Sequence, residues 1–184
     1  MKSAKHEKDK KSSHHNRWPL TAFIMAMVLS AILTLASEAM LDGAGMAVAL
    51  LILLLFIGLG ILFDILGTAV MSADAKPFHS MAAHKVKGAK QALMLLRNAD
   101  RVSNVCNDVV GDICGIVSGA TSAVIVTQLQ RGLSVQSVLI SVGVTALVSA
   151  MTIGGKAMGK PFAMKQSIRV VYLAGRIMYL FHRR

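Results

Sequence analysis

The chain has 184 residues, of which 54% are hydrophobic and only 5% aromatic, and it carries a formal charge of +11. This composition indicates a protein whose solvent is the bilayer, because a soluble core is usually richer in aromatic residues. A basic nucleic-acid-binding domain would not normally contain several long uncharged segments, so we expect no nucleic-acid partner and instead a bilayer with anionic lipids. The sequence contains no motif for nucleophilic, phosphate-binding or zinc-dependent catalysis, so we expect no enzymatic activity.

Residues 1–18 are rich in lysine and predict a disordered basic tail on the cytoplasmic side. Four apolar segments follow, and each approaches the ~20 residues that a helix needs to cross the hydrocarbon layer. They cover roughly residues 20–36, 46–71, 113–129 and 135–153. The first segment predicts an extra N-terminal transmembrane helix over 19–37, an uncleaved signal anchor, with a cleaved signal peptide as the alternative.

Lysine and arginine are distributed unevenly among the segments that flank the predicted spans. The N-terminal tail, the segment after the second span and the C-terminal tail are basic, whereas the link after the first span contains only Glu38 and Asp42 as charged residues. Only Arg131 is charged in the link after the third span. Because cytoplasmic loops collect positive charge, we expect a multi-pass protein of the plasma membrane with both termini in the cytoplasm.

Two of the basic segments have an amphipathic pattern. The first predicts a juxtamembrane helix over 79–98, with Met81 and Leu93 on its apolar face, and the second predicts a C-terminal interfacial helix over 161–182. A proline lies at or near the start of each helix, where its missing N–H costs little. The predicted fold class is therefore all-α integral membrane, with four transmembrane helices and two amphipathic interfacial helices.

A single carboxylate, Asp64, interrupts the second apolar span. An ionised side chain at the bilayer centre costs at least about 2.5 kcal/mol, and it usually faces the bundle interior and a partner. Asp64 therefore predicts a cation ligand or proton carrier. The alternative is a residue near the cytoplasmic end of the span that reaches a lysine or water.

A second group of oxygen-bearing side chains precedes the third apolar segment. Asn104, Asp108 and Asp112 are spaced i, i+4, i+8 and share one helical face, with Asn107 adjacent. Carboxylate and amide oxygens suit Mg²⁺ or another hard divalent cation. The alternative is that the two aspartates begin a helix at the membrane interface, near its positive dipole end and an arginine.

Small residues repeat at four-residue intervals at Gly111, Gly115 and Gly119. Such a stripe allows two helices to approach closely in lipid, where packing replaces the hydrophobic driving force. We expect it to form a helix contact that supports a homodimer, and Gly67 with Ala69 to offer one possible facing surface.

The order of three motifs resembles a known membrane domain. A span ending in "GTAV", the basic segment "KVKGAKQALMLLRNADR" and the polar segment "NVCNDVVGDI" are similar to parts of the CNNM/CorB/CorC magnesium-transport family. The resemblance assigns residues 46–184 to a CNNM/CorC-like transmembrane domain. In that family, a Ser-x-Ser-Glu-Thr-Ala-like motif and a Gly-Asn motif together bind dehydrated Mg²⁺ in a homodimer.

Carried over residue by residue, the resemblance gives Thr68 and Ala69 as the Thr-Ala pair and Asn107 as the asparagine of the Gly-Asn motif. Gly67 stands where the family has glutamate, and Asp64 where it has the first serine. The aspartates of this chain would then compensate for the missing glutamate. The resemblance also leads us to expect nucleotide-binding CBS domains, which the sequence lacks, so a separate regulatory protein is a possible partner.

The sequence thus predicts a membrane protein that handles divalent cations, in Mg²⁺ transport or efflux. The alternative is a degenerate transport domain that serves as a membrane adaptor or scaffold for another protein. The predicted metal-site residues are Asp64, Thr68, Asn104, Asn107, Asp108 and Asp112.

Overall fold

The computed structural model describes residues 18–133 and 138–182, so the predicted tail lies outside the described residues except for its last one. The described part is α-helical and contains no strand. Four helical segments are long and apolar enough to cross a membrane: Leu20–Leu41, Met46–Ser72, Ala99–Gly132 and Val138–Lys165. The predicted all-α membrane fold class is therefore confirmed.

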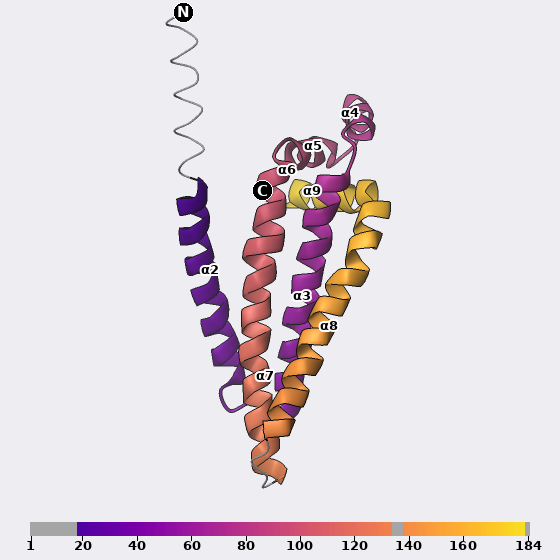
Figure 1. Cartoon of the computed structure of the whole chain (residues 1–184). Helices are drawn as coiled ribbons and strands as arrows, with labels where there is room; N and C mark the ends of the chain where they lie inside the picture. Colours follow the sequence, from indigo (N-terminus) through magenta and orange to yellow (C-terminus); the bar gives the residue numbers. More distant parts are fainter. Residues whose placement is uncertain (1–17, 134–137, 183–184) are drawn as a thin grey trace, which may run out of the picture.

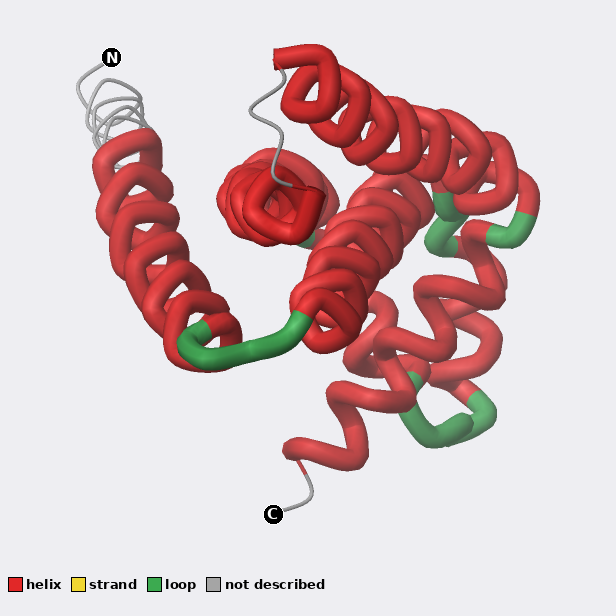
Figure 2. The backbone as a smooth tube through the Cα atoms, turned by 90° about the horizontal axis from the view of Figure 1, so that it is seen from below, coloured by secondary structure: helices red, strands yellow, loops and turns green. Residues whose placement is uncertain are grey.

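Helix α3 (Met46–Ser72) forms the centre of the bundle. It packs against α7 (Gly111–Leu133) and α8 (Val138–Lys165) along much of its length. Helix α2 (Trp18–Leu41) lies at the edge of the bundle and contacts mainly α7, as Figures 1 and 2 show. Most apolar side chains of α2 are exposed, which fits a helix whose surroundings are lipid.

The third span is one continuous helical segment that begins earlier than the apolar run. It comprises α6 (Ala99–Asn104), the π-helical turn η1 (Val105–Val110) and α7. The helical segment begins at Ala99, before Asp108 and Asp112, so the two aspartates do not begin it. A π-helical turn widens the backbone and is found frequently at functional sites.

Three shorter helices gather at the end of the bundle where α2 begins (Figure 1). They are α4 (Lys76–Ala83), α5 (Ala89–Arg97) and α9 (Ser167–His182), and together we call them the end platform. Where one helix was expected over 79–98, the structure has two. The chain turns between them through Lys85, with φ of 57°, and Gly88, with φ of 90°. Positive φ is incompatible with a continuing right-handed helix.

The C-terminal helix also differs from its predicted bounds. Pro161 does not start it but lies inside α8, which continues to Lys165. The proline removes one intrahelical hydrogen bond there, and α8 nevertheless continues through it. The interfacial helix begins at Ser167 instead of residue 161.

The end platform is joined to the spans by a buried apolar cluster that includes Val70, Phe78, Ala163 and Val171. Phe78 is fully buried in the same cluster as Val70, so α4 is anchored to the end of α3. Transfer of such a side chain from water to a protein interior stabilises the folded state by about 1.5–3 kcal/mol. The cluster therefore fixes the platform against the end of α3 that follows Asp64.

Candidate functional site

Asp64 lies on the buried face of α3, with 5% of its surface exposed. Its Oδ2 atom is buried and has no hydrogen-bond partner. A buried polar atom without a partner is costly and is rare in native structures, even more so for a carboxylate. Asp64 is thus a carboxylate of the bundle interior that protein groups leave incompletely compensated.

Asn107 lies in the π-helical turn and packs on α3 at Gly67. A Cβ atom built on Gly67 would lie 2.7 Å from Asn107 Cγ and still closer to Oδ1, so only glycine leaves room for the amide. Asn107 Nδ2 donates a hydrogen bond of 3.3 Å to Ser103 Oγ. Its Oδ1 atom is buried and has no partner, as is true of Asp64 Oδ2.

The two unpaired oxygens belong to the same interhelical seam. Gly60, Asp64 and Gly67 share one face of α3, because they are spaced i, i+4, i+7. Gly60 approaches the third span at Gly111 and Cys114, since its Cβ position is 3.3 Å from Cys114 Cβ. Gly67 approaches the same span at Asn107, so Asp64 lies between these two contact points.

Helix α8 contributes a charged group at the same level. Its Gly155 packs against Ile61, and a Cβ on Gly159 would lie 2.9 Å from Ile65 Cγ1, so this part of α8 lies along α3 beside Asp64. Lys156 Nζ is 3.4 Å from the Cβ position of Gly111. Lys156 was not among the predicted site residues. The sequence signal was nevertheless present, because Lys156, like Asp64, is an ionisable residue in a predominantly apolar helix.

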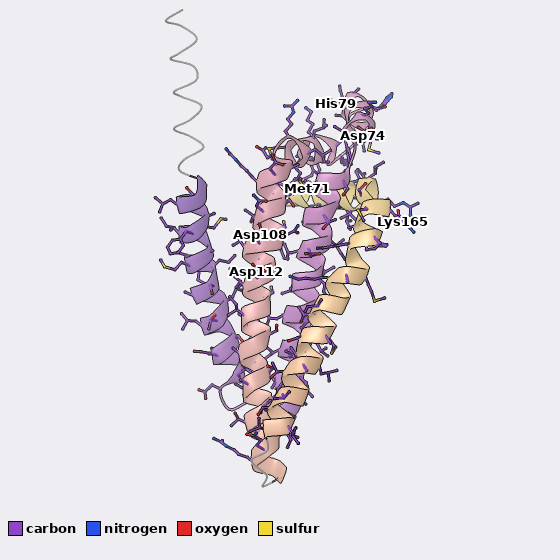
Figure 3. All side chains as sticks on the ribbon, in the orientation of Figure 1. Met71, Asp74, His79, Asp108, Asp112 and Lys165 are labelled. Carbon is purple, nitrogen blue, oxygen red and sulfur yellow. The ribbon has the colours of Figure 1, made fainter. Side chains whose placement is uncertain are left out.

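The other predicted site residues do not join this seam. Asn104, Asp108 and Asp112 are all exposed, whereas Asn107 is partly buried. Figure 3 labels the two aspartates on the third span. The buried part of the predicted site therefore contains Asp64 and Asn107 but not these three side chains. Spacing tells which residues share a face but not which face meets the neighbouring helix.

Thr68 is half-buried, and its carbonyl oxygen accepts a hydrogen bond of 2.8 Å from Ser72 Oγ. Across the described residues, no group of three or more His, Cys, Asp and Glu side chains is arranged to hold a metal ion. The candidate site therefore consists of mixed oxygen ligands, Asp64 and Asn107, and not of a carboxylate cluster.

Of the glycine stripe, Gly111 lies against Gly60 of α3, but Gly115 and Gly119 make no such close approach. Gly67 faces Asn107, while Cβ atoms built on Gly115 or Gly119 would meet nothing within 4 Å. These two glycines line a partly open groove of about 180 Å³ between α7 and α8. Five of its lining side chains carry hydroxyl groups: Ser118, Ser122, Thr145, Ser149 and Thr152.

The comparison with protein families gives an independent result. The model of the CNNM family, described as the Cyclin M transmembrane N-terminal domain, matches residues 50–183. No curated protein and no solved structure gave a match. The matched region contains the candidate site and the end platform, whereas α2 precedes it. The family is associated with divalent-cation transport, of Mg²⁺ in particular. Because the match covers well over half of the chain, it confirms the resemblance found in the sequence: this multi-pass membrane protein belongs to the CNNM family.

Proposed function

We propose that this CNNM-family protein binds a divalent cation, Mg²⁺ first of all, within its helix bundle and takes part in its transport or efflux. The observation that carries the proposal is the pair of buried, unpaired oxygens, Asp64 Oδ2 and Asn107 Oδ1, on facing surfaces of α3 and η1. Carboxylate and amide oxygens are both ligands of hard divalent cations. Mg²⁺ usually keeps several of its waters, so two protein ligands are compatible with binding.

The exposed acidic face of the third span supports a further part of the proposal, a homodimer. Asp108 and Asp112 are exposed in the single chain and belong to the candidate span Ala99–Gly132. Within a membrane, carboxylates that face lipid are costly. A second copy of the chain would cover this face. In that assembly the oxygens of Asn104, Asp108 and Asp112 would line a route for the cation beside the buried site.

The test is Mg²⁺-dependent thermal stabilisation of the detergent-purified protein. A ligand that binds only the folded state, at 100 times its Kd, adds about 2.7 kcal/mol to the free energy of unfolding. Asp64→Asn removes the charge and Asn107→Leu removes the amide oxygen, so we expect both to reduce the Mg²⁺-induced rise in Tm. Asp74→Asn is the matched control, because Asp74 is exposed and outside the site. Equal Mg²⁺ responses in all four proteins would refute the site.

A membrane adaptor or scaffold is the second candidate function. It is favoured by the ammonium of Lys156 at the level of the candidate site, because a positive charge there opposes cation binding. An adaptor predicts a stably folded wild-type protein whose Tm does not depend on Mg²⁺. The same thermal measurement therefore separates the two functions.

We further propose that the end platform lies on the cytoplasmic side of the plasma membrane and contacts anionic lipids. The platform and its flanks carry most of the positive charge of the described residues, including Lys87, Lys90, Arg169 and Arg176. Positively charged segments prefer the cytoplasmic side, and each basic residue near an anionic surface contributes about 1 kcal/mol. With four spans, both ends of the chain then lie in the cytoplasm.

A further inference from the structure

Lys156 is a charged residue in an apolar helix, and nothing in the proposed cation site explains it. A lysine at membrane depth is costly and normally faces the bundle interior, where it pairs with another group. Lys156 is half-buried and its Nζ atom lies toward the backbone of Gly111, on the side of α8 that meets the third span. The question is which group compensates its charge.

Asp64 is the buried carboxylate at the same level of the bundle. Gly60 lies one turn before Asp64 on the same face of α3, and its Cβ position is 3.8 Å from Gly111 O. Lys156 Nζ is 3.4 Å from the Cβ position of the same Gly111. Asp108 and Asp112, the acidic side chains nearest to Gly111 in the sequence, are exposed, whereas Asp64 is buried. The unpaired Oδ2 atom of Asp64 needs a positive or hydrogen-bonding partner, and Lys156 needs a negative one.

We propose that Lys156 is the resident counter-cation of Asp64, and that a divalent cation entering the site must compete with its ammonium. In the metal-free protein the lysine charge compensates the buried carboxylate through space. When the metal binds, the ammonium turns away from the site. The competition between Lys156 and a divalent cation rests on the proposed function. The charge coupling between Asp64 and Lys156 does not.

The competition has a direct consequence for affinity. Removing a unit positive charge from beside a divalent cation strengthens binding, by about tenfold or more at the effective dielectric of a protein interior. Lys156→Met should therefore lower the Kd for Mg²⁺, measured by titration of Tm or by calorimetry. Lys160→Met is the matched control, because Lys160 lies one turn farther along α8 and is exposed; its Kd should equal that of the wild type. An unchanged or weaker affinity in Lys156→Met would overturn the competition.

The coupling is tested without metal, in protein treated with a chelator. Asp64→Asn and Lys156→Met should each lower Tm, because each leaves the other charge uncompensated in the bundle. The double variant should recover much of the loss, which a double-mutant cycle reports as a coupling between the two positions. Lys156→Gln serves as a second neutral variant if the methionine variant expresses poorly, and Lys156→Arg, which keeps the charge, should retain the wild-type Tm.

The outcomes distinguish this inference from the proposed function. Additive losses of Tm in the double variant would refute the Asp64–Lys156 pair whatever Mg²⁺ does. A clear coupling in a protein that shows no response to Mg²⁺ would refute the cation site and the competition but support the charge pair. Repeating the cycle with Asp112→Asn in place of Asp64→Asn should give no coupling, and a coupling there would reassign the partner of Lys156.

Discussion

The side-chain amide of Asn107 packs directly on the backbone of Gly67. A Cβ atom at position 67 would overlap the amide, so the absence of a side chain on α3 sets the position of Asn107 in the π-helical turn. The same turn directs Asn107 Oδ1 into the seam that contains Asp64. A glycine that replaces the glutamate expected from the family motif therefore has a structural role of its own.

Gly67→Ala should displace Asn107 from the seam. Overpacking of this kind typically costs about 1–3 kcal/mol, and it should also weaken the Mg²⁺-induced rise in Tm. The matched control is Gly58→Ala on the same helix, because its Cβ would meet nothing within 4 Å. The control should be neutral or stabilising by up to about 1 kcal/mol. Identical Tm values for the two variants, with and without Mg²⁺, would contradict the proposed role of Gly67.

Gly175→Ala should separate α9 from α5. The added Cβ would lie 2.6 Å from Gly88 O and 2.8 Å from Ala92 N, and backbone atoms have no rotamer by which to move aside. We expect a loss of about 1–3 kcal/mol and faster proteolysis between α4 and α5. Gly154→Ala in α8, where the new methyl group enters open space, is the control. Unchanged proteolysis in the Gly175 variant would show that this crossing does not hold the platform together.

Gly115→Leu should disrupt the proposed homodimer. Gly115 lines the groove between α7 and α8, and a Cβ atom added there would meet nothing within 4 Å, so the groove has room at this position for a side chain of a second copy. Crosslinking in membranes should show less dimer for this variant, because the leucine fills the small-residue surface. Ala120→Leu, at an exposed position on another face of α7, should leave the dimer unchanged. Equal crosslinking of both variants would remove the glycine stripe from the interface.

Labelling of single cysteines in intact cells should establish the orientation. Ala39→Cys, at the end of α2, should react with a membrane-impermeant reagent, whereas Ser80→Cys in the end platform should react only after permeabilisation. Both positions are exposed, and the native Cys106 and Cys114 are buried, so the wild-type protein gives the background. Labelling of Ser80→Cys without Ala39→Cys would reverse the proposed topology.

The sequence alone determined the membrane fold and the family. Long apolar runs predict spanning helices, because the hydrocarbon layer leaves backbone groups no partner outside the helix. It also singled out Asp64, since a carboxylate in such a run needs a structural or functional explanation. The segment from Lys85 to Arg101 identified the family, although it did not show that the chain turns at Gly88.

Tertiary structure decided which polar groups come together. The spacing of Asn104, Asp108 and Asp112 predicted one shared face, but only the packing of the third span showed that all three side chains are exposed. Asn107 instead faces α3. Asn107 packs on Gly67, and Lys156 Nζ lies near the Cβ position of Gly111, although the members of each pair are far apart in the chain. Helical periodicity is a local property, whereas the choice of the buried face depends on a neighbouring helix that the local sequence does not contain.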